Sequence, residues 1–165
     1  MTKAFSNRDY TVVQLIFLVL LRVSIGWHIL YEGAVKIINP DWSSFGYLMD
    51  SKGIFAVLFK NMAAHQGVLQ AVDYLNMYGL FLIGLGLVAG LFTRLSVVCG
   101  IVLLSFYFLS HPPLAGIHYI IPQEGSYLLV NKTLIEIFAL CVLLVFPTGQ
   151  SVGLDRFFQK KNYNR

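Results

Sequence analysis

The sequence predicts an all-α integral membrane protein, a four-transmembrane-helix bundle with both termini cytoplasmic and an interfacial helix or lid in its first outer loop. Of its 165 residues, 57% are apolar and only 12% are charged, and the apolar residues gather in four long segments. The mean hydropathy is +0.70. Soluble domains have about 45–50% apolar and about 25% charged residues, and disordered chains combine low hydrophobicity with high charge. Both of those classes are therefore excluded.

The first two spans are predicted over residues 11–31 and 73–92, since a spanning helix needs about 20 mostly apolar residues. Arg22 and His28 interrupt the first span. The second carries no charge after its first residue, Asp73. The first span is too long for a cleaved signal and contains an arginine, so it is expected to remain as a helix.

The third and fourth spans are predicted over residues 95–110 and 128–146. A His-Pro-Pro sequence from His111 ends the third, because proline cannot continue a helix. Lys132 and Glu136 interrupt the fourth, which closes at a proline. The whole chain, 1–165, is expected to form a single membrane domain.

The distribution of Lys and Arg predicts the orientation, because cytoplasmic loops carry an excess of both. With the N-terminus inside, the connecting segments hold seven of these residues on the inner side and three on the outer side. Both termini are therefore predicted inside, and loops 37–72 and 111–127 outside. In the first loop, Trp42 and the apolar run 53–59 predict an interfacial helix or a lid over the bundle.

Ionisable residues within the spans indicate where function resides, because they are costly in a bilayer and usually face a bundle interior. Counted from the inner helix ends, Arg22 and Glu136 each lie at a depth of about 16 Å, which predicts a pair near mid-bilayer. The other polar groups lie higher, at about 22 Å or more. They predict a polar pocket that opens outward, formed by Lys132, Asn76, His28, Asp73, Glu32, Lys36 and His111.

Each of these features also has a structural interpretation. The Arg22–Glu136 pair can hold two helices in register, and Glu32–Lys36 can be an interfacial ion pair. Lys132 can extend to the surface. The remaining polar groups can also be explained by structure alone. Asp73 can begin a helix, and His111 and His118 can face solvent. The concentration of these groups at one end of a small bundle is what favours a site.

The two cysteines, Cys99 and Cys141, sit in apolar runs without a CxxC motif or a nearby His/Cys cluster. Neither a disulfide framework nor a zinc or iron–sulfur site is expected. No haem, flavin or dinucleotide motif occurs either, and no bound metal is predicted.

Several sequence blocks resemble the DoxX/DoxD family, and they occur in the same order. The first is LRVSIGWHILYEGAVKIINPDW, in which the family pattern falls on Arg22, Gly26, Glu32, Gly33, Lys36, Asn39, Pro40 and Trp42. The others are YLNMYGLFLIGLGLVAGLFTRL, YFLSHPP, YLLVNKTLIEIFAL and GLDRF, so the resemblance extends from about residue 20 to residue 157.

This resemblance implies a four-helix membrane protein. The DoxD branch is similar to the membrane subunit of thiosulfate:quinone oxidoreductase, which couples thiosulfate oxidation to quinone reduction. Other members are membrane accessories of redox or stress systems. The competing hypothesis is accordingly a non-enzymatic scaffold, or an accessory protein that binds a small solute or a lipid.

On the redox hypothesis, the expected substrate- or quinone-binding residues are Arg22, Lys36, Lys132, Asp73, Asn76 and His111. The two lysines would hold an anion in the outward pocket, and Arg22 would hydrogen-bond a quinone oxygen. Glu32 and His28 would handle protons, and Glu136 would relay the protons that quinone reduction consumes.

Quinone is the expected electron acceptor, and the redox centre is expected on a second subunit or a periplasmic partner. Membrane lipid is the other expected partner, an oligomer is possible, and nucleic acid is not expected because the net charge of +4 forms no basic stripe. The expected location is a prokaryotic cytoplasmic membrane.

Overall fold

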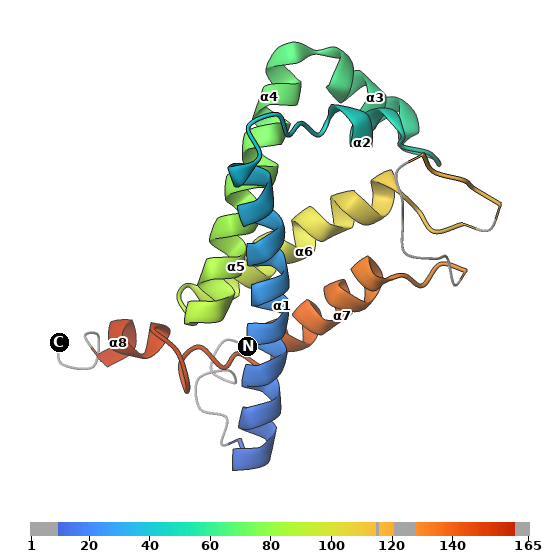
Figure 1. Cartoon of the computed structure of the whole chain (residues 1–165). Coiled ribbons are helices and arrows are strands. Elements are labelled where there is room, and N and C mark those ends of the chain that lie inside the picture. Colours follow the sequence, from blue (N-terminus) through green and yellow to red (C-terminus); the bar gives the residue numbers. More distant parts are fainter. Residues whose placement is uncertain (1–9, 115, 121–127, 161–165) are drawn as a thin grey trace, which may run out of the picture.

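The computed structural model describes residues 10–114, 116–120 and 128–160, and these residues form helices joined by turns (Figure 1). The π-helical segment η1 joins α4 to α5. In chain order the elements are α1 (Val12–Ile38), α2 (Phe45–Met49), α3 (Ala56–Ala64), α4 (Gln66–Tyr74), η1 (Leu75–Gly79), α5 (Leu80–Ala89), α6 (Thr93–Ser110), α7 (Lys132–Val145) and α8 (Asp155–Lys160).

Three helical stretches are long and apolar enough to cross a membrane: α1, the continuous stretch Gln66–Ala89, and α6. They correspond to the first three predicted spans, although each helix begins or ends at residues somewhat different from those predicted. The predicted fourth span coincides with α7, which has only 14 residues. At 1.5 Å per residue its length is about 21 Å, less than the bilayer core of about 30 Å. A fourth crossing and the orientation of the termini stay predictions.

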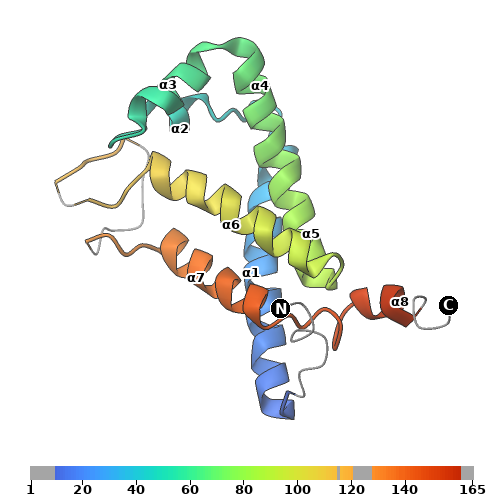
Figure 2. The ribbon, with the colours of Figure 1, turned by 180° about the vertical axis from the view of Figure 1, so that it is seen from behind.

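Close approach of α1 and α5 organises the bundle (Figures 1 and 2). A Cβ on Gly84 of α5 would collide with the backbone of Leu30, and one on Gly33 of α1 would collide with Phe81. Small residues let membrane helices approach closely. Around this contact lies the apolar core, which contains Ile25, Ile29, Leu80, Ile83, Leu87, Val97, Leu103, Leu104, Leu140 and Leu143.

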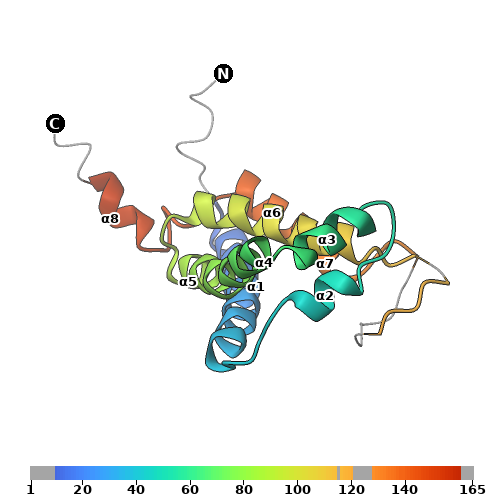
Figure 3. The ribbon, with the colours of Figure 1, turned by 90° about the horizontal axis from the view of Figure 1, so that it is seen from above.

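The segment between α1 and α4 folds into a helical cap, made of α2 and α3, over one end of the bundle (Figure 3). Leu48, Phe59 and Ala63 form its own small apolar core. By contrast, Ile54 and Val57 are 95% and 71% exposed. Exposed apolar side chains next to a buried cluster fit the predicted interfacial helix or lid.

The residues after α7 fold back onto α1 and α5, and Arg22 holds them there. Arg22 is buried, and its guanidinium donates to Thr148 Oγ1 (3.0 Å) and to the Val152 carbonyl (2.7 Å). The predicted Arg22–Glu136 pair is therefore wrong. The prediction counted the depths of Arg22 and Glu136 from the inner ends of their helices, as if all helices began at one level. In the structure, the N-terminal part of α1 extends well beyond the ends of α5 and α7 (Figure 1).

Gly84→Val tests the α1–α5 contact. The added side chain must push α1 away, and overpacking of this kind costs about 1–3 kcal/mol, so the melting temperature in detergent should fall. Gly67→Ala is the control, because a Cβ there meets open space. A Gly84→Val protein that melts at the wild-type temperature would contradict the account of this contact.

Arg22→Met tests the anchoring of the C-terminal segment. The change leaves the buried Thr148 hydroxyl without its donor, which costs about 1–3 kcal/mol, and also removes the hydrogen bond to the part-buried Val152 carbonyl. We expect a lower melting temperature and faster proteolysis after residue 147, and neither effect for Arg94→Met, whose side chain is exposed. Equal proteolysis rates in the two variants would refute an anchoring role for Arg22.

Candidate functional site

A cavity of about 780 Å³ lies beneath the α2–α3 cap, bounded by α1, α4, η1, α6 and α7. Its volume is in the range of small-molecule sites, about 300–1,000 Å³. Seven of the nine residues predicted from the sequence line it: His28, Glu32, Lys36, Asn76, His111, Lys132 and Glu136. The polar groups scattered along the chain are thus brought together around one space.

Three polar residues of α1 reach this cavity because they follow one another at intervals of four. His28, Glu32 and Lys36 therefore lie on one face of the helix. His28 Nδ1 lies 2.9 Å from Glu136 Oε1 of α7, and Lys36 Nζ lies 3.6 Å from Glu32 Oε2. The first of these pairs bridges α1 and α7 beside the cavity.

Lys36 also takes part in a hydrogen-bond network that joins α1, α6 and η1. Its ammonium donates to Tyr107 Oη (3.4 Å), and the Tyr107 hydroxyl donates to Asn76 Oδ1. The Asn76 amide in turn donates to the Val72 carbonyl (2.8 Å). Asn76 is buried in the π-helical turn, a distortion that often occurs at functional sites. The ammonium lies 5.3 Å from the ring centre of Trp42, within cation–π range.

Asp73 does not line the cavity; it supports the wall. Its carboxylate accepts from the Ser44 backbone N–H (2.7 Å), from Ser44 Oγ (2.5 Å) and from Ser43 Oγ (3.0 Å). Both serines line the cavity. Asp73 therefore ties the start of α2 to α4, instead of contacting a ligand. Arg22 is the other predicted site residue outside the cavity.

His111 occupies the wall of the cavity just after α6, and it is buried. Its ring lies 3.9 Å from that of Tyr47 and 4.7 Å from that of Tyr119, centroid to centroid. Burial lowers the pKa of His111 to about 4; Asp50 opposes this shift and Lys52 adds to it. Burial likewise raises the pKa of Tyr47. Both side chains are consequently neutral near pH 7.

Two tyrosines of the cavity, Tyr47 and Tyr107, are not among the site residues predicted from the sequence. Tyr107 lies in the last turn of α6 and His111 directly follows the helix, four residues later, so the spacing places the two on the same side. That spacing was a usable signal. Tyr47 offered none, because it reaches the site only through the fold of the α2–α3 cap, where its ring packs edge-on against Tyr107 at 5.8 Å.

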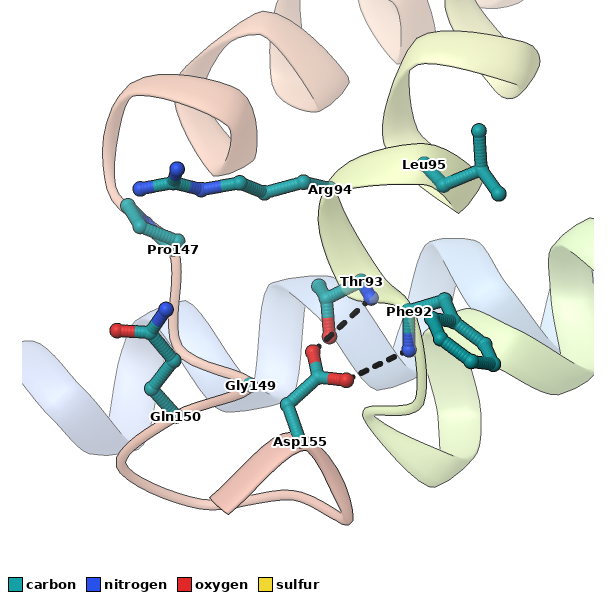
Figure 4. Close-up of a pocket in the computed structure, with 8 residues that line it drawn as sticks. All are labelled: Phe92, Thr93, Arg94, Leu95, Pro147, Gly149, Gln150 and Asp155. Carbon is teal, nitrogen blue, oxygen red and sulfur yellow. Dashed lines mark hydrogen bonds between the residues drawn. The ribbon is translucent and has the colours of Figure 1, made fainter. Parts of the chain in front are cut away.

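A second, smaller pocket of about 280 Å³ lies at the α5–α6 turn (Figure 4). Its main polar feature is Asp155, whose carboxylate accepts from the backbone N–H groups of Phe92 (2.6 Å) and Thr93 (3.0 Å). An acidic group at a helix N-terminus is stabilising. Asp155 thus caps the N-terminus of α6.

Comparison with known proteins gives one family match. The DoxX family model matches residues 17–112, more than half of the chain. That range includes most of α1, the cap, α4, η1, α5 and α6, but not α7. The chain has no match among the curated proteins and none among the solved structures.

The low pKa of His111 predicts an acid-dependent loss of stability. An unfolded histidine has a pKa of about 6.5, whereas that of folded His111 is about 4. As the pH falls through this interval, the unfolded state takes up a proton that the folded state does not, so stability falls. His111→Gln removes this contribution, so its melting temperature should fall less than that of wild type between pH 6.5 and 4.

The matched control is His118→Gln, because His118 is exposed. This control should retain the wild-type dependence of melting temperature on pH. Identical slopes for wild type and His111→Gln would show that His111 is protonated as easily in the folded state as in the unfolded chain.

Proposed function

The chain belongs to the DoxX family, and on that premise we propose that it is the membrane subunit of a quinone-linked oxidoreductase. The quinone ring binds in the cavity beneath the α2–α3 cap. The observation that carries this proposal is an apolar cavity into which α1, η1, α6 and α7 each direct polar side chains.

The shape and chemistry of the cavity fit a quinone. The walls are mainly apolar and include the rings of Trp42, Phe59 and Tyr107, which suit a flat, uncharged ring. Hydrogen-bonding groups such as Lys36 and His111 suit the ring oxygens. A membrane-embedded protein also meets its quinone in the lipid phase, where no aqueous channel is required.

The charge balance of the cavity favours a neutral ligand. The formal charges of Lys36 and Lys132 are matched by those of Glu32 and Glu136, and Lys36 is already paired with Glu32. A dianion such as thiosulfate would enter a site with no surplus positive charge. We therefore assign thiosulfate oxidation, where it occurs, to the second redox subunit or periplasmic partner, in place of the anion site expected at the two lysines.

A quinone bound here accepts electrons and protons, and the residues of the cavity supply its surroundings. Lys36, oriented by Tyr107 and Asn76, offers a positive charge to a ring oxygen that gains electron density. The His28–Glu136 pair, whose two members line the cavity 2.9 Å apart, supplies the protons that the reduced ring takes up. Arg22 has no part in this scheme, because it anchors the C-terminal segment.

The remaining topology is proposed on the same basis. α7, together with the apolar residues that flank it, completes a fourth crossing of a prokaryotic cytoplasmic membrane. Both termini lie inside, and the α2–α3 cap lies on the outer surface. A cap in this position would present the cavity to a periplasmic partner.

Quenching of Trp42 fluorescence tests the proposal. In a Trp27→Phe background, Trp42 is the single tryptophan left, because the chain has two. Duroquinone, a small neutral quinone, should quench it saturably in detergent or liposomes. Ala71→Phe, which adds a ring at the cavity wall, should weaken binding at least about tenfold, a loss of about 1.4 kcal/mol.

The matched control is Ala64→Phe, because Ala64 is exposed at the end of α3 and does not line the cavity. It should bind duroquinone like the parent protein. Thiosulfate at millimolar concentration should not compete with the quinone. Quenching that does not saturate, or that Ala71→Phe leaves unchanged, would refute a quinone site in this cavity.

A further inference from the structure

Within the described part of the chain, two buried nitrogens of cavity-lining residues have no hydrogen-bond partner: Nδ1 of His28 and Nε2 of His111. His28 Nδ1 lies 2.9 Å from the carboxylate of Glu136, which leaves Nε2 of His111 as the atom to be explained. His111 is only 2% exposed. Buried polar atoms in native proteins nearly always have a partner, and leaving one without it costs about 1–3 kcal/mol. His111 lines the cavity, but Nε2 itself is covered in the free protein, so a bound ligand supplies the missing partner once the packed rings of Tyr47 and Tyr119 shift aside.

The other parts of the imidazole ring are already engaged. Nδ1 lies 3.0 Å from Ser110 Oγ. The rings of Tyr47 and Tyr119 pack on the imidazole. These contacts hold the ring in one orientation and leave Nε2 as its remaining hydrogen-bonding atom.

We propose that Nε2 of His111 hydrogen-bonds an oxygen of the ligand and selects for a neutral, planar ring that carries a carbonyl or hydroxyl group. This inference rests on the proposed function and names the contact that distinguishes a quinone from a plain hydrocarbon of the same shape. His111 is thus a binding and specificity residue, and Ser110 is the residue that positions it.

Ser110 lets the same histidine recognise both oxidation states of such a ring. A serine hydroxyl can donate or accept. When Ser110 donates to Nδ1, Nε2 carries the proton and can donate to a quinone carbonyl. When Ser110 accepts from Nδ1–H, Nε2 can accept from a quinol hydroxyl. The low pKa of His111 supports this role, because the neutral imidazole has these two tautomers.

The backbone around this pair is held independently of any ligand. The Ser110 carbonyl accepts from Ser51 Oγ (2.8 Å) and from the Lys52 backbone N–H (3.3 Å). The end of α6 is thereby joined to the residues that follow α2. Substitution of His111 should therefore weaken ligand binding more than it lowers the stability of the fold.

Two probes of the same shape test the inference: duroquinone, and durene, the tetramethylbenzene that lacks its two oxygens. Binding is measured as the rise in melting temperature of the detergent-solubilised chain with ligand concentration. His111→Phe keeps an aromatic ring and removes the nitrogen atoms. We expect it to weaken duroquinone binding about tenfold, the effect of one lost hydrogen bond, and to leave durene binding unchanged.

His118→Phe is the matched control and should bind both probes like wild type. His111→Gln, which retains a hydrogen-bonding amide, should recover part of the affinity for duroquinone, and melting without ligand reports whether each variant is folded. Equal weakening of both probes by His111→Phe, or no weakening of either, would overturn the role of Nε2 and leave the quinone site standing. Failure of duroquinone to bind the wild-type chain would instead overturn the proposed function and this inference together.

Discussion

The close contact between α1 and α5 is the constraint on which the rest of the structure depends. Gly33 and Gly84 allow the two backbones to meet, and this sets the rotation of α1. Gly26 also faces α5, where it meets Leu87 and Val88. Two residues along a helix correspond to a turn of about 200°, so His28, two positions after Gly26, points away from α5. Glu32 and Lys36 follow His28 on the same face. A close contact that glycines make possible thus determines which side chains reach the cavity.

The polar groups that reach the cavity are organised so that little charge is left uncompensated. His28 faces Glu136 across α1 and α7, while Lys36 faces Glu32 and connects through Tyr107 to Asn76. In a medium of low dielectric constant, such networks are stable only when their members are satisfied. Nε2 of His111 departs from this pattern, which is why it bears on ligand recognition while the ion pairs bear on assembly and proton movement.

Much of the site could be predicted from the sequence, because polar residues within apolar helices have to share a protein interior. Seven of the lining residues follow from this rule without any knowledge of helix packing. It failed for Arg22, since a depth counted along one helix says nothing about where that helix begins relative to its neighbours. It also failed for Asp73, whose partners Ser43 and Ser44 approach only once the cap has folded. Long-range contacts of this kind leave no periodic trace in a sequence.

Photoaffinity labelling with an azido-quinone in reconstituted membranes tests the central claim most directly, because it locates the bound ring without assuming any residue's role. Mass spectrometry of the labelled peptides should place the label on residues 28–42 of the chain and on residues 103–111, and excess duroquinone should prevent it. Labelling that is concentrated at the second pocket near Asp155, or on exposed residues such as Phe17, would contradict the claim that the cavity beneath the α2–α3 cap is the quinone site.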